Sequence, residues 1–352
     1  MKMALPRRYG KSVGDIIKIK SDFFEKNEEM LKLSAHQADA LLRQPKRTEC
    51  KICHGSIGEA AGQEMLYESQ RMRYFRCPVC GHVNSEYEDN EDFASRVYIA
   101  DDYLANYSED DRQKYNTRRD TIYIPKAEFL IKALEKDGVK KKNLKILDDG
   151  AGSGYFVSAL RQLGIERVDG IEISEPQVQF ANTMNGEDIL TQVDAPDIAS
   201  IIETADVNVI TFIGVLEHIT NLDDILEALK KNKKVQYIYF SVPMFSMSCI
   251  FEASHQKCYN RHAGGTHTHL FTESSLKYMS KRIGFEEYAV WKFGSDMMDL
   301  YRMICVSLDQ NGNSALREVF SKKFLPMLDE MQEVVDRHED ASEIHMIIKR
   351  KP

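Results

Sequence analysis

The chain has 352 residues, and 47 Lys and Arg against 55 Asp and Glu give it a formal net charge of −8. Its hydrophobic fraction of 43% excludes a wholly disordered chain. The acidic excess argues against a surface built to cover nucleic-acid phosphates. The most apolar stretch, 235–251, is broken by polar residues and falls short of the ~20 apolar residues of a membrane span. Because the basic N-terminus also lacks the apolar run of a signal peptide, the sequence predicts a cytoplasmic protein.

The first 85 residues are predicted to contain a helical segment (1–47) and a metal module (48–85). Apolar residues recur at helical spacing between 12 and 43. Four of the seven cysteines then form two Cys-x-x-Cys pairs, a pattern that predicts a structural zinc site made by Cys50, Cys53, Cys77 and Cys80. Disulfides, which need an oxidising compartment, and haem attachment at the first pair, which needs export, are the alternatives.

The region 86–124 is predicted to be a helical connector. It opens with the acidic run 86–92, which reads as a solvated linker or helix start. Five tyrosines follow, and we expect them to pack over a neighbouring domain, with stacking on a sugar or base as the alternative: Tyr98, Tyr103, Tyr107, Tyr115 and Tyr123.

From residue 125 onward, helical patterns alternate with short β-branched runs. This rhythm predicts a parallel sheet covered on both faces by helices. The expected strands are 144–147, 167–173, 207–212 and 235–242, then 286–292 and 344–349. The expected helices are 153–164, 175–184, 222–232, 296–307 and 315–337.

A glycine-rich loop follows the first of these strands. Asp148 closes the strand, and Gly150, Gly152 and Gly154 precede a helix, an arrangement in which backbone amides can approach a ligand. The loop is not a dinucleotide fingerprint, because the third small residue is missing, and no Lys follows to make a P-loop.

Acidic residues close the next strands of the same region. Glu172 comes 18 residues after Gly154, where an acid can accept the hydroxyls of a ribose. Asp194 follows the third strand region, and Val-Leu-Glu-His, ending in Glu217 and His218, follows the fourth.

As a set, these motifs make residues 125–350 resemble class I S-adenosylmethionine-dependent methyltransferases. Thr268–Thr272, Ser275-Leu276 and Ile283–Phe285 continue the resemblance. It implies an α/β, Rossmann-like, seven-stranded, mostly parallel sheet over 125–352. It further implies that the cofactor S-adenosylmethionine is bound by Asp148, Gly150, Gly152, Gly154, Glu172, Asp194 and Glu217. Asp149 departs from the apolar residue usual at its position.

The order of zinc module, tyrosine-rich connector and methyltransferase is similar to bacterial sugar methyltransferases. That similarity implies methyl transfer to a hydroxyl or carbon of a sugar, often nucleotide-linked, in polysaccharide biosynthesis. It implies a small-molecule partner rather than nucleic acid, and a homodimer is a state that the sequence permits. The second C-terminal Rossmann-like domain of the longer sugar C-methyltransferases has no counterpart in this sequence.

Methyl transfer needs an aligned nucleophile and a base for its proton, and histidine is the natural base near neutral pH. His218, His267 and His269 are the candidates, and each has a structural alternative such as capping a helix or orienting a loop. A metal site made by the histidines at 255, 262, 267 and 269 matches no ligand motif.

Two other functions stay open at this level. The first is an RNA methyltransferase whose zinc module grips RNA through the basic and aromatic run 71–76. The second is a non-catalytic protein that binds the cofactor and assists assembly.

Overall fold

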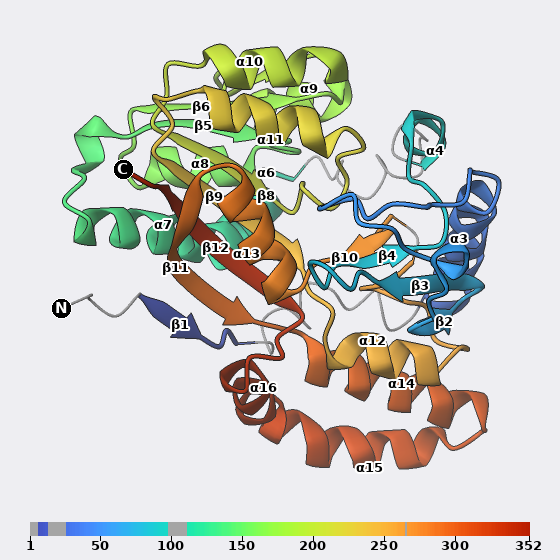
Figure 1. Cartoon of the computed structure of the whole chain (residues 1–352). Helices are drawn as coiled ribbons and strands as arrows, with labels where there is room; N and C mark the ends of the chain where they lie inside the picture. The colour runs from blue at the N-terminus through green and yellow to red at the C-terminus, as the bar shows by residue number, and fades with distance from the viewer. Residues whose placement is uncertain (1–5, 13–25, 98–110, 265) are drawn as a thin grey trace.

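The computed structural model describes residues 6–12, 26–97, 111–264 and 266–352. Its centre is one eight-stranded sheet (Figure 1). All neighbouring strands run parallel except β12, which is antiparallel to both of its neighbours. Across the sheet the order is β1 (Arg7–Tyr9), β11 (Phe285–Phe293), β12 (Glu343–Arg350), β9 (Tyr237–Pro243), β8 (Val209–Ile213), β5 (Lys145–Asp149), β6 (Arg167–Glu172) and β7 (Leu190–Gln192).

The order of the parallel strands reverses between β5 and β8. After β5 the chain adds β6 and β7 on one side, then returns to add β8 and β9 on the other. Ligands of open parallel sheets bind at the carboxyl edge of such a reversal, because the connecting loops diverge there. The glycine-rich loop leaves β5 at this edge.

The predicted mostly parallel sheet is confirmed, but the prediction of seven strands was wrong. The eighth strand is β1, which extends the sheet beyond β11. The amide of Val290 donates to the carbonyl of Pro6, and the indole of Trp291 donates to that of Gly10. Three residues are too few to show an alternation of apolar and polar residues, and this strand pairs with residues 283 positions later, Arg7 with Val290.

Two apolar cores cover the two faces of the sheet. One is formed with α7 (Ile124–Lys136), α8 (Tyr155–Gln162) and α9 (Glu175–Asn185). The other is formed with α10 (Ile198–Thr204), α11 (Leu222–Lys231) and α13 (Glu273–Arg282), which crosses the β11–β12 part of the sheet (Figure 1). Cys50, Cys77 and Cys80 belong to this second core, so the cysteine module packs on the same interior as the sheet.

The N-terminal module contains α3 (Asn27–Leu41), within the predicted helical segment, and a small antiparallel sheet. Residues 13–25 of that segment lie outside the described residues. The sheet has β2 (Tyr67–Ser69), β3 (Met72–Arg76) and β4 (Val83–Ser85), and its fourth strand is β10 (His269–Leu270). A strand from the C-terminal half of the chain therefore completes the N-terminal sheet.

The acidic run 86–92 contains a helix start at Glu91, as one of its two predicted forms, but its first part is not solvated. Asp89 is buried and forms ion pairs with Lys51, which is buried too, and with Arg47, whose side chain is 8% exposed. Glu86 is also buried and pairs with Lys46. The first part of the run packs the start of the cysteine module against the segment that leads to α4 (Glu91–Val97), whereas Glu91 and Asp92 are exposed.

The connector leads into the sheet through α6 (Arg112–Arg118), a short π-helical turn and α7. Tyr115 is buried and stacks on Tyr155 with 4.3 Å between ring centroids, and Tyr123 stacks on the other side at 5.2 Å. These two tyrosines pack as predicted. The predicted tyrosines at 98, 103 and 107 lie outside the described residues.

Further helices lie below the sheet edge in Figure 1. They are α12 (Met247–Ser254), α14 (Asp296–Gln310), α15 (Ser314–Phe324) and α16 (Leu328–Arg337). Among the residues with a described structure, none of the helices has the length and apolarity to cross a membrane.

Candidate functional site

The glycine-rich loop turns tightly between β5 and α8. Gly150, Gly152 and Gly154 all have positive φ, at 65°, 55° and 72°. A Cβ on Gly150 would lie 2.8 Å from the side chain of Val215, and one on Gly154 would lie 2.9 Å from Ala181. Gly150 and Gly154 therefore have no room for a side chain, and the loop lies against the loop after β8 at its first glycine and against α9 at its last.

Two carboxyl groups are buried where β5 enters this loop. Asp148 accepts a hydrogen bond of 2.5 Å from the hydroxyl of Thr211 on β8. Burial raises the pKa of Asp148 to about 8 and that of Asp149 to about 7. Asp149 stands where the resemblance leads us to expect an apolar residue, and it is buried as that residue would be. Such neighbouring acids suit a positively charged ligand.

Glu172 lies at the end of β6 with its carboxylate turned to the glycine loop. One oxygen accepts the amide of Gly152 at 2.8 Å, and the other accepts the amide of Ser174 at 2.9 Å. Asp194 is exposed just beyond β7, at the same edge. The candidate cofactor residues at or just beyond the ends of β5, β6 and β7 therefore lie at one edge of the sheet, and Glu172 contacts the glycine loop directly.

The loop after β8 brings Glu217 and His218 to His267. Donor atoms of these three residues all lie within 4.8 Å of one another. The Glu217 carboxylate is 4% exposed, and its Oε2 has no hydrogen-bond partner among the described residues. The rings of His218 and His267 stack with 5.2 Å between their centroids. Burial raises the pKa of Glu217 to about 8 and lowers those of His218 and His267 to about 3 and 4.

The tautomer of His267 follows from its hydrogen bond. Its Nδ1 lies 3.2 Å from the carbonyl oxygen of His262, which can only accept, so Nδ1 carries the proton and Nε2 keeps a lone pair. His262 itself is held by Asp299 at 2.8 Å, and Asp299 also accepts from Arg261 at 2.9 Å. Glu252 accepts the backbone amides of residues 261–263, which fixes the loop that carries His267.

His269, the third histidine candidate, is fully buried. Its Nδ1 lies 3.0 Å from Nε2 of His82 in the cysteine module, and its Nε2 has no partner in the described part of the chain. Burial lowers the pKa of His269, and His218 adds a smaller electrostatic contribution, which places the two rings in one neighbourhood. A group as deep as His269 cannot touch a bulky acceptor, whereas His218 and His267 are partly exposed.

The four cysteines of the two Cys-x-x-Cys pairs lie together, as predicted. Their sulfur atoms are 3.5 Å apart between Cys50 and Cys80 and 3.4 Å apart between Cys53 and Cys77. A tetrahedral zinc with bonds of about 2.3 Å needs sulfurs about 3.8 Å apart, so the geometry fits zinc and is far too wide for disulfides. The amide of Gly55 donates to Cys53 Sγ at 3.4 Å and Asn84 to Cys50 Sγ at 3.6 Å, as around a thiolate.

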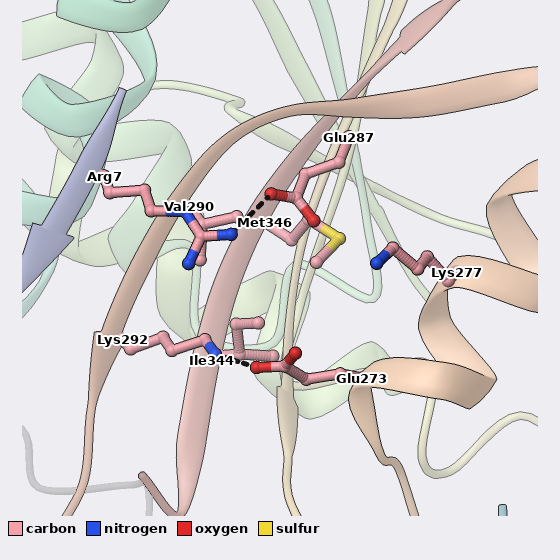
Figure 2. Close-up of a pocket in the computed structure, with 8 residues that line it drawn as sticks. All are labelled: Arg7, Glu273, Lys277, Glu287, Val290, Lys292, Ile344 and Met346. Carbon is pink, nitrogen blue, oxygen red and sulfur yellow. Dashed lines mark hydrogen bonds and ion pairs between the residues drawn. The ribbon is translucent and has the colours of Figure 1, made fainter. Parts of the chain in front are cut away.

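A second surface feature lies apart from the glycine loop, between β1, β11, β12 and α13 (Figure 2). Its charged groups neutralise one another: Arg7 pairs with Glu287 at 3.5 Å, and Lys292 pairs with Glu273 and Glu339. Among the described residues that line this small pocket, only the charge of Lys277 is left without an ion pair, and the pocket lies away from the glycine loop, so we assign the function to the edge around that loop.

Sequence reasoning missed two residues of this region. His82 was visible as the residue that follows Cys80-Gly81, but nothing in the sequence points to His269 as its partner. Thr211 lies inside an apolar strand, and only the pairing of β5 with β8 brings it to Asp148. The set of four histidines that matched no metal motif is not assembled: the His255 ring bonds to the carbonyl of Phe251 instead.

Comparison with known structures finds several methyltransferases among the similar proteins. Magnesium protoporphyrin IX methyltransferase from Synechocystis with bound SAH is 13% identical, covering 71% of this chain and 94% of that one, with a TM-score of 0.44. A sarcosine dimethylglycine methyltransferase from Galdieria sulphuraria is 16% identical over 65% and 86%, with a TM-score of 0.41. The plantazolicin methyltransferase BamL is 14% identical over 74% and 94%, with a TM-score of 0.46. Similarities this distant carry no information on substrate or residue roles.

No curated protein matches the sequence. A family model described as a methyltransferase domain matches residues 115–290, which is half of the chain and contains the glycine loop, Glu172 and the Glu217–His218 pair. The protein belongs to this methyltransferase domain family.

Proposed function

We propose that the protein transfers a methyl group from S-adenosylmethionine to a small polar acceptor, a sugar or nucleotide-linked sugar used in glycan biosynthesis. The observation that carries the proposal is the position of Glu217, His218 and His267. Glu217 and His218 follow β8, His267 reaches them from the loop between α12 and β10, and the loop after β8 lies against the glycine loop. A donor bound at the loop and an acceptor bound at the histidines would then be neighbours.

The residues at the loop fit the cofactor by charge. S-adenosylmethionine supplies an activated methyl group and brings a sulfonium and an ammonium, which buried Asp148 and Asp149 can balance. Glu172 would accept the two ribose hydroxyls, at the cost of its present bonds to backbone amides. Asp194, exposed beyond β7, would accept from the adenine amine.

His218 and His267 are the groups that would activate the acceptor. Both are partly exposed, and both are neutral at pH 7 because burial lowers their pKa values to about 3 and 4. Removing the proton of a hydroxyl or an acidic carbon prepares it for in-line attack on the methyl group. His269 would act through position, since it is fully buried against His82.

Zinc would be structural in this scheme. Four thiolate ligands complete a tetrahedron and leave no position for substrate. The folding free energy of metal binding would stabilise a module whose cysteines belong to the second core.

The surroundings of residues 71–76 favour a small acceptor over RNA. Tyr74 and Phe75 are buried and offer no face for base stacking. Arg71 pairs with Asp39, and Arg73 pairs with Glu59 and Glu86, so most of the positive charge of the run is compensated.

The test uses S-adenosylmethionine labelled in the methyl group. The purified protein is incubated with an extract of its native host, and products are separated into small-molecule, glycan, RNA and protein fractions. Label in nucleotide sugars or glycan, absent with the Glu172→Gln variant, is the expected result. Label lost on ribonuclease treatment would establish the RNA alternative. Cofactor binding without label in any fraction would favour the non-catalytic alternative.

A further inference from the structure

We propose that Glu217, His218 and His267 form a divalent-cation site that binds and acidifies the acceptor hydroxyl. This inference rests on the proposed function and deepens it, because it assigns the acceptor atom to oxygen. One carboxylate and two imidazoles from two loops converge here, and their donor atoms lie within 4.8 Å of one another. His267 lies outside the Val-Leu-Glu-His motif that contains Glu217 and His218, so the sequence alone does not connect the three residues.

The separations suit a metal of the first transition row. A cation with bonds of about 2.1 Å can lie between donors up to about 4.2 Å apart. Two such bonds at a tetrahedral angle place their donors about 3.4 Å apart, and Glu217 Oε1 and His218 Nε2 are 3.9 Å apart, so a small side-chain rotation lets this pair share a cation. The wider separations within the 4.8 Å limit close with a small rotation of the side chains.

Glu217 provides the independent observation. Its carboxylate is 4% exposed, and Oε2 meets no hydrogen-bond partner among the described residues. An unpartnered buried carboxylate oxygen is costly, and a bound cation removes that cost. The nearest protein nitrogen of the cluster, on His218, is too distant at 3.9 Å to donate to this residue.

The outer contact of His267 is that of a metal ligand, and His218 is held by the backbone of the same loop. A ligand histidine donates its other ring nitrogen to a carbonyl or carboxylate, which fixes the tautomer. His267 does so through Nδ1 to the carbonyl of His262 at 3.2 Å. His218 makes a hydrogen bond with the backbone of Thr266. The loop is anchored in turn by the 2.8 Å contact between His262 and Asp299.

A set of two histidines and one carboxylate leaves coordination positions for substrate oxygens. A sugar can fill two of them with neighbouring hydroxyls. The bound hydroxyl then loses its proton to water, its oxygen attacks the methyl carbon, and the carbon–sulfur bond breaks. The products are a methyl ether and S-adenosylhomocysteine, with one proton released. In this scheme His218 and His267 activate the acceptor as ligands rather than by taking its proton.

Manganese is the probe, because it prefers oxygen and nitrogen ligands and leaves a four-thiolate zinc site alone. Zinc-replete protein is titrated with Mn²⁺ and followed by electron paramagnetic resonance and calorimetry. We expect one site per chain in the wild type and at least ~10-fold weaker binding in Glu217→Gln and His267→Gln. His255→Gln, which alters a histidine of the same loop outside the cluster, should bind Mn²⁺ as the wild type does.

The same samples separate this inference from the proposed function. Binding of S-adenosylhomocysteine by His267→Gln, together with its unfolding temperature, shows whether that variant keeps its fold. No manganese site in the wild type, or equal affinity in all variants, would overturn the cation site even if methyl transfer is found. A manganese site that is lost in the two variants would stand even if the labelled methyl group reached no sugar.

Discussion

His82 of the cysteine module and His269 of the methyltransferase half face each other with 3.0 Å between Nε2 and Nδ1. The proton positions follow from Ser275, whose hydroxyl donates to the carbonyl of Thr272 and whose oxygen lies 3.3 Å from Nδ1 of His82. Nδ1 of His82 is therefore the donor, and its Nε2 accepts from His269. Burial keeps both rings neutral by lowering their pKa values, that of His82 to about 3. The bond leaves the Nε2 lone pair of His269 directed away from the module.

His82→Ala should lower the free energy of unfolding by ~1–3 kcal/mol or more, because it leaves the buried Nδ1 of His269 without an acceptor and opens a cavity. His54→Ala is the matched control, since the His54 side chain is 48% exposed and contacts only surface acids. Urea denaturation of both variants measures the difference. An equal loss of unfolding free energy in the two variants would show that the buried pair of rings stabilises the protein no more than an exposed histidine does.

Chelating the zinc should destabilise the whole molecule in one transition. The cysteines share a core with α11 and α13, and Arg282 on α13 donates to the carbonyl of Ile52 at 3.2 Å. Zinc content and thermal unfolding, each measured before and after chelation, test this coupling. Cys77→Ser should behave like the chelated protein, and Cys305→Ser, a buried cysteine outside the cluster, should keep its zinc. A separate early transition for the module would contradict the shared core.

Glu172→Gln should weaken binding of S-adenosylhomocysteine by about 10- to 100-fold. The proposed pair of charge-assisted bonds to ribose is worth roughly 1.5–3 kcal/mol, and glutamine keeps the shape but not the charge. Isothermal titration gives the affinity, and Glu175→Gln, an exposed acid at the start of α9, is the control. Unchanged affinity in Glu172→Gln would remove this residue from the cofactor site.

Affinity for S-adenosylmethionine should rise with pH between about 6 and 8.5. Burial raises the pKa values of Asp148 and Asp149 to about 8 and 7, and the positive cofactor binds best when these acids are ionised. The increase is at most tenfold per pH unit for each proton released, and Asp148→Asn should reduce it. A pH-independent affinity in the wild type would rule out both acids as countercharges.

The same two acids predict how stability without cofactor depends on pH. In the native state they hold protons that the unfolded chain releases above pH ~4, so the native state binds more protons in this range. Their contribution to the free energy of unfolding therefore decreases as pH rises from about 4 to 8. Urea denaturation of wild type and Asp148→Asn at several pH values checks the sign, because the variant should show the shallower decrease.

Asp299→Asn should cost about 3–5 kcal/mol of stability. It removes the charge that His262 and Arg261 share, while His262 stays buried and the Arg261 side chain stays only 13% exposed. The ion pair raises the pKa of His262 and lowers that of Asp299. The histidine's contribution is present below pH ~6.5 and is lost as pH rises through its raised pKa. The acid's contribution is present above pH ~4 and is lost at lower pH. Denaturation across pH 4–9 separates the contributions of the histidine and the acid. An unchanged dependence of stability on pH in the variant would show that the ion pair of Asp299 with His262 does not stabilise the protein.

The sequence by itself determined the local features. Continuous apolar runs predicted β5, β6, β8 and β9 to within a few residues, because strands buried on both faces tolerate little else. Glycines at fixed spacing predicted the loop, which has positive φ at all three positions. The two Cys-x-x-Cys pairs predicted the group of four thiols that the fold brings together. Each signal lies within a short stretch and reflects a backbone or ligand requirement at that place.

Only the tertiary structure decided the relationships between distant segments. The burial of Asp89 depends on Arg47 and Lys51, about 40 residues earlier, and a local run of charges gives no sign of such partners. The strand β1 exists because β11 offers an edge, and β10 joins the cysteine module because β4 does. His267 reaches Glu217 because the buried carboxylates of Glu252 and Asp299 fold its loop. Charge pairing and strand edges act across space, so a linear pattern cannot contain them.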